Sequence, residues 1–155
     1  MEKAKTMNDP VLGELTWDAT MSWWVTSVNL PMLKNIDVGI EPDPDLSLHI
    51  SLLIQFKNWI TSNHESFIKV AVDDLFEYDL IWPENFIKNA DDLSEDEFED
   101  ATELIEKDLA TKLKIHALDV SDGVVSLWLD TGGYTTDHLV QTKLNEDHEI
   151  IEMTL

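Results

Sequence analysis

The sequence contains no cysteine and no arginine. Without cysteine, the chain has no disulfide framework, no thiolate zinc site and no cysteine nucleophile. Without arginine, it lacks the planar guanidinium group that most often recognises phosphates, carboxylates and base edges. It also lacks an apolar run long enough for a signal or membrane-spanning segment. We therefore expect a cytoplasmic protein in a reducing compartment.

Positive charge is scarce. The chain has 155 residues, of which 32 are acidic and 10 are lysines, and its formal net charge is −22. Such a charge repels nucleic-acid phosphates and anionic membrane surfaces, so we expect neither as a direct partner. It favours a cationic partner. The apolar content of 43% and the six tryptophans are nevertheless sufficient for a folded core.

The hydrophobic pattern predicts a flexible N-terminus over residues 1–8 and one α+β domain over residues 9–155. An N-terminal three-strand meander is predicted first, with strands at 11–17, 21–30 and 35–41. Alternation with period two places Ile36, Val38 and Ile40 on one face of the third strand. Trp23 and Trp24 should then lie on opposite faces of the second strand.

Three central helices are predicted next. The first runs from Leu46 to Ile60 and directly follows Asp45, which can cap its N-terminus. Its residues also alternate like a strand, but helical spacing and length favour a helix. We expect Ser62-Asn63 to separate this helix from a second one over residues 64–81. A capping box, Ser94 with Glu97, opens the third helix.

The C-terminal part predicts a four-strand antiparallel meander. Its strands are expected near residues 113–117, 124–129, 139–144 and 149–155, with a tight turn at Asp122-Gly123. Because strands and helices occur in separate runs, the helices should pack on the sheet in an α+β arrangement.

Two motifs raise the question of catalysis. Asp130-Thr131-Gly132 matches the three-residue signature of aspartic proteases, but no second copy is present, so we interpret it as a strand end and a turn. The pairs Asp137-His138 and Asp147-His148 resemble metal-binding pairs. A hairpin between them would separate the two histidines by roughly 20 Å, so one ion could not bind both. We expect solvated polar residues here, and surface or helix-start positions for His49, His64 and His116.

The acidic residues concentrate in one segment. Residues 91–108 contain ten acidic side chains and one lysine. The segment lacks the glycine that a calcium-binding EF-hand loop requires, and an amphipathic helix runs through it. We interpret it as a solvated helix face that can also dock a basic protein. The candidate partner-binding residues are Asp92, Glu95, Asp96, Glu99, Asp100 and Glu103.

Three stretches resemble a group of small acidic bacterial proteins of unassigned function, which occur as predicted immunity proteins of polymorphic or contact-dependent toxin systems. They are Asp9-Pro10-Val11-Leu12-Gly13-Glu14-Leu15-Thr16-Trp17-Asp18, Ser62-Asn63-His64-Glu65 and Asp137-His138-Leu139-Val140. The first is the most specific, and the likeness covers most of the chain from residue 9. The resemblance implies an intracellular protein that binds and neutralises a cognate toxin without catalysis, and it implies no catalytic residues.

We therefore expect a non-enzymatic protein-binding domain with no cofactor and no metal, whose partner is a cationic protein such as a toxin domain. Two alternatives stay open. One is a small regulatory or scaffold domain. The other is a metal-dependent hydrolase that uses Asp137 and His138 together with a residue from another strand.

Overall fold

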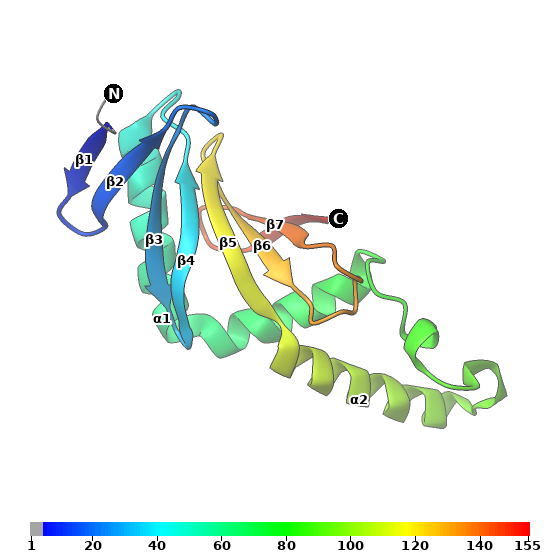
Figure 1. Ribbon diagram of the computed structural model, residues 1–155. Coiled ribbons are helices and arrows are strands. Elements are labelled where there is room, and N and C mark those ends of the chain that lie inside the picture. The colour runs from blue at the N-terminus through cyan, green and yellow to red at the C-terminus, as the bar shows by residue number, and fades with distance from the viewer. Residues whose placement is uncertain (1–4) are drawn as a thin grey trace.

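The computed structural model describes residues 5–155, which form one eight-stranded sheet and two α-helices (Figure 1). The strands lie in the sheet in the order of the sequence. Their bounds are β1 Thr6–Asp9, β2 Gly13–Asp18, β3 Trp23–Leu30, β4 Leu33–Ile40, β5 Lys114–Ser121, β6 Val124–Asp130, β7 Val140–Leu144 and β8 Ile150–Thr154.

The two halves of the sheet meet at β4 and β5, which pair in parallel between Asp37↔Ala117 and Ile40↔Val120. All other neighbouring strands are antiparallel. Parallel neighbours need a long crossover connection. Both helices, α1 (Leu46–Glu77) and α2 (Glu95–Lys112), lie in that crossover, together with the short 3₁₀ helices η1 (Pro83–Phe86) and η2 (Ala90–Asp92).

Helix α1 covers one face of the sheet and contacts β3, β4, β5, β6 and β8 (Figure 1). As predicted, it begins behind Asp45, whose side chain accepts a hydrogen bond from the Leu48 amide at 3.1 Å. Its apolar stripe is buried against the inner face of the sheet, where Ile36, Val38 and Ile40 also lie. The helix prediction for residues 46–60 is thus confirmed, and so is the shared face of those three β4 residues.

The prediction of three central helices is wrong, because α1 continues through Ser62-Asn63 for 32 residues. Asn63 donates its side-chain amide to the Trp59 carbonyl at 2.8 Å, a bond that keeps the side chain within the helix. The buried residues Ile60 and Phe67, on either side of the expected break, are seven positions apart and share one face. Burial of this continuous stripe outweighs the low helix propensity of asparagine.

The N-terminal part also differs from the prediction, since it has four strands where three were expected. The additional strand, β1, begins at Thr6 and takes in the end of the predicted flexible segment 1–8, of which residues 1–4 lie outside the described part. The C-terminal half is the predicted four-strand antiparallel meander, and both halves belong to one sheet. The architecture is α+β.

The tryptophan pair in β3 behaves as the alternation predicts. Trp24 is buried and lies edge-on to Trp17, with ring centroids 5.3 Å apart. Trp23 is half-buried and lies over Gly39 on the opposite face. A Cβ atom at Gly39 would be 3.0 Å from the Trp23 ring, so glycine makes room for the indole.

His49 lies near the start of α1, as expected, but it is fully buried rather than at the surface. Its Nδ1 lies 2.7 Å from the Glu41 carbonyl oxygen, and its Nε2 lies 3.1 Å from the Gly123 amide. The amide can only donate, so Nε2 accepts and Nδ1 carries the proton toward the carbonyl. The ring therefore ties the start of α1 to the end of β4 and to the β5–β6 turn.

Within residues 5–155, neither helix combines the length and the apolar character that crossing a lipid bilayer requires.

Candidate partner-binding surface

Helix α2 extends away from the sheet (Figure 1). Only Ile105 and Leu109 of this helix are buried, and both belong to its second half. The first half and the connector before it lie at one end of the molecule, where they are accessible from several sides. A partner could therefore contact this half of α2 without meeting the sheet.

The predicted capping box is present at the start of α2. The Ser94 hydroxyl accepts from the Glu97 amide, and Glu97 accepts from the Ser94 amide, each at 3.2 Å. These hydrogen bonds from Ser94 lower the pKa of Glu97 because they stabilise its charged form. The cap fixes the start of the helix and thereby the positions of the carboxylates that follow.

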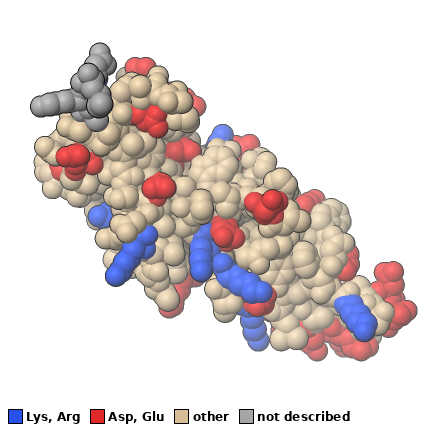
Figure 2. Space-filling view, viewed as in Figure 1, with Lys and Arg blue, Asp and Glu red and all other residues tan. Residues whose placement is uncertain are grey.

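The six predicted partner-binding residues are all exposed: Asp92, Glu95, Asp96, Glu99, Asp100 and Glu103. Within residues 5–155 the ion pairs are Lys112–Asp108 and Lys143–Glu152, and neither involves one of the six. Figure 2 shows acidic side chains gathered at the end of the molecule where α2 begins. Five of them lie in α2, and Asp92 lies at the end of η2 just before it. We call these six residues the acidic face of α2.

The negative field of this segment also acts on its neighbour Glu106, which borders the groove between α1 and α2. Burial raises the pKa of Glu106, and the charges of Asp73 and Glu103 raise it further. Lys69 and Lys107 line the same groove, so its three carboxylates exceed its lysines by one. The repulsion among these carboxylates disfavours the free protein. A cationic partner would relieve this repulsion.

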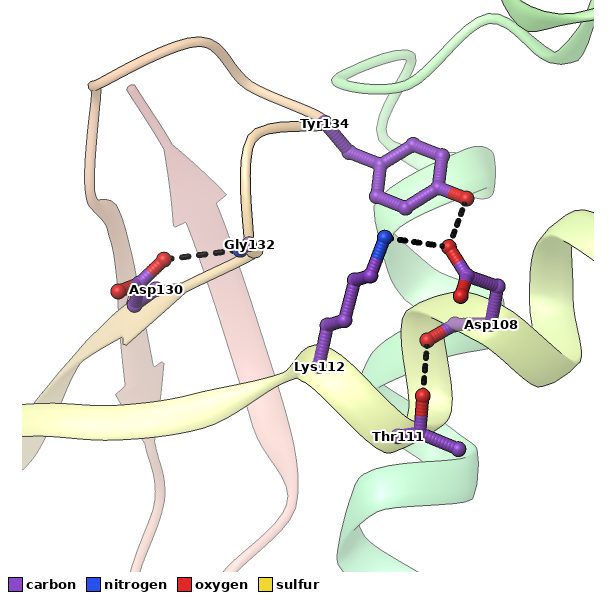
Figure 3. A network of polar contacts seen from close by, with 6 residues as sticks. All are labelled: Asp108, Thr111, Lys112, Asp130, Gly132 and Tyr134. Atoms are coloured by element: carbon purple, nitrogen blue, oxygen red, sulfur yellow. Dashed lines mark hydrogen bonds and ion pairs between the residues drawn. The ribbon is translucent and has the colours of Figure 1, made fainter.

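The other end of α2 is anchored by a contact that the sequence analysis missed (Figure 3). The Tyr134 hydroxyl donates to Asp108 at 2.6 Å, and Lys112 forms an ion pair with the same carboxylate at 2.9 Å. The bond from Tyr134, and then Lys112, lowers the pKa of Asp108. Burial and the bond to Asp108 raise the pKa of Tyr134 to about 12. Since 26 residues separate Tyr134 from Asp108, no local pattern indicates this contact.

Two large apolar side chains are exposed near α2, namely Leu104 in the helix and Phe86 in the connector before it. Leu104 lies one helical turn after Asp100 and is 67% exposed. Phe86, in η1, is 45% exposed and packs against Tyr134 with ring centroids 4.8 Å apart. An exposed aromatic side chain such as Phe86 is a suitable anchor for a protein partner.

The two motifs considered for catalysis are placed as follows. Asp130 ends β6 and accepts from the Gly132 amide at 2.8 Å, which is the predicted strand end and turn (Figure 3). Asp137 and His138 are exposed in the loop before β7. Among residues 5–155, no group of three histidine, aspartate or glutamate side chains is close enough to hold a metal ion.

His148 is not a solvated turn residue, contrary to the expectation. Its ring stacks on Trp59 of α1, with centroids 4.8 Å apart and planes at 12°. Burial lowers the pKa of His148, against the opposing charge of Asp147. Asp147 is exposed, as expected. The position of the His148 ring on α1 depends on a contact between segments far apart in the sequence.

Comparison with known proteins gives no relative: no family model, no curated protein and no solved structure matches this chain.

Proposed function

We propose that this chain is a non-enzymatic, intracellular immunity protein that binds and neutralises a cationic toxin domain. The observation that supports the proposal most is the acidic face of α2, whose six exposed carboxylates project from one end of the molecule without ion-pair partners among residues 5–155. The sequence resemblance to predicted immunity proteins supports the same class of function.

Binding in this proposal has two physical components. The carboxylates attract a basic surface over distances up to the Debye length, which is about 8 Å at physiological ionic strength, and so speed the encounter. Leu104 and Phe86 then enter apolar depressions of the partner and slow dissociation. The bound chain would block the toxin surface by non-covalent contact alone, so inhibition requires no chemical reaction.

The direct test expresses the gene that lies next to the gene of this chain, which the proposal expects to encode a toxin that stops growth. Co-expression of this chain should restore growth, and purified chain and toxin should form a stable complex. A variant with all six carboxylates of the acidic face changed to amides should rescue poorly.

A control variant removes six exposed carboxylates elsewhere and has the same net charge: Glu14, Asp37, Asp43, Glu65, Asp137 and Glu146. It should rescue like the wild type. Equal loss in both variants would show that net charge, rather than the acidic face, matters. No rescue by the wild-type chain would contradict the immunity function and leave the regulatory or scaffold alternative.

A further inference from the structure

A cavity of about 370 Å³ lies between α1 and the turn that joins β7 to β8, away from the acidic face of α2. Its apolar walls come from α1 and from the start of β8 and include Phe67, Val70 and Ile150. Phe67 is buried, whereas Val70 is 48% exposed at the mouth. The cavity thus offers an apolar interior that is open to solvent on one side.

Three carboxylates line the same cavity: Asp74 from α1, and Asp147 and Glu149 from the β7–β8 turn. Among residues 5–155, no lysine lines this cavity. The organic ligand that such a lining favours has an apolar stem and a positive end group, because the three carboxylates attract a cation and repel an anion.

The end of α1 also indicates that the ligand carries a positive charge. The last turn of a helix carries a partial negative charge and normally favours lysine or histidine. Here it holds Asp73, Asp74 and Glu77, and no basic residue. Burial raises the pKa of Asp74, and the charges of Glu77 and Asp73 raise it further. This arrangement destabilises the free protein, and a bound cation beside Asp74 would offset it.

The aromatic wall of the cavity is held in place from two sides. His148 has a left-handed backbone conformation, with φ of 63°, which turns its ring back over Trp59. Phe67 packs edge-on against the same indole, with ring centroids 6.2 Å apart. Trp59 is therefore fixed in position at the cavity rather than free to fill it.

We propose that this cavity binds an organic cation, namely a protonated amine or a guanidinium group on an apolar stem. The stem packs against Phe67 and Val70, and the positive group lies between Asp74 and Asp147. The ligand is either a free amine or a lysine or arginine side chain of another protein. The proposal does not depend on the immunity function.

The test uses 2-phenylethylamine as the probe and follows the indole N–H signal of Trp59 by NMR, assigned with Trp59→Phe. For a ligand of this size we expect saturable binding with a dissociation constant of about 1–10 mM. The neutral analogue 2-phenylethanol should bind at least about fivefold more weakly. A capped lysine peptide, titrated in parallel, shows whether a protein side chain can also bind.

Asp74→Asn and Asp147→Asn should each weaken amine binding about threefold, the effect of one partly exposed charge pair. Glu65→Gln is the control, because it removes one charge from an exposed carboxylate of the same helix that does not line the cavity. It should change the affinity by less than about 1.5-fold. No saturable shift with either amine, equal binding of the alcohol, or equal losses in all three variants would overturn the proposal.

Discussion

Removal of the His49 side chain should destabilise the whole fold, because this ring joins three segments that are distant in the sequence. His49→Ala breaks the hydrogen bonds to the Glu41 carbonyl and the Gly123 amide. Each such bond contributes about 1 kcal/mol, more where the partner is left without water. Truncation of a fully buried side chain adds about 1–2 kcal/mol of lost packing. We expect a total loss of about 3–4 kcal/mol.

The assay is equilibrium unfolding in urea, followed by tryptophan fluorescence and circular dichroism. For a chain of this length, the predicted loss corresponds to a fall in Tm of about 6–16 °C. His49→Gln keeps one donor and one acceptor and should recover about half of the lost stability. His138→Ala removes an exposed ring and should change stability by less than about 0.5 kcal/mol.

A free energy of unfolding for His49→Ala within about 0.5 kcal/mol of the wild type would refute this reasoning. It would mean that water replaces both hydrogen bonds and that the ring does not hold the segments together. An intermediate in the unfolding curve of His49→Ala would indicate that the β5–β6 turn separates before the rest of the fold. The loss in free energy of unfolding is therefore taken only from a two-state transition.

Three further predictions concern α2 and the turns. Because the pKa of Tyr134 is raised from 10.0 to about 12, its contribution to stability is complete below pH 10 and is lost as the pH rises toward 12. The stability difference between the wild type and Tyr134→Phe, which lacks the bond to Asp108, should therefore shrink over that range in urea unfolding. Ser94→Ala removes the cap and should cost about 1 kcal/mol, with faster hydrogen exchange confined to the first turns of α2. Gly132→Ala should lower Tm more than Gly123→Ala: both glycines have positive φ, but only at 132 would the new Cβ lie 2.7 Å from a lysine side chain at the end of α2. Equal effects of the two glycine changes would show that backbone strain alone decides.

Local signals allowed the sequence to predict the beginnings of both α-helices and most strands. Asp45 and the Ser94–Glu97 pair are caps whose geometry depends on three or four residues, and both are present. The length of α1 was not predicted, because Ser62-Asn63 suggested a break between two helices although the apolar stripe continues through it. Ile60 and Phe67 are in phase on one helix face, and this relation was the available signal.

Contacts between distant segments were not predictable in the same way. The exposed acidic face of α2 follows from composition and helical spacing, so its six residues could be named from the sequence. By contrast, the bond between Tyr134 and Asp108 and the stacking of His148 on Trp59 depend on how the sheet and the helices pack. For His49 a signal existed, since it shares a helical face with Leu53, Phe56 and Ile60.

The most direct test of the central claim is the association rate constant of the toxin with this chain at low and high salt. We predict that the six-amide variant of the acidic face associates about tenfold more slowly than the wild type at low salt. The difference should nearly vanish at 0.5 M salt, and the control variant with six carboxylates removed elsewhere should retain most of the wild-type rate. An association rate that is the same for the wild type and the acidic-face variant at low salt would contradict the claim that α2 is the docking surface.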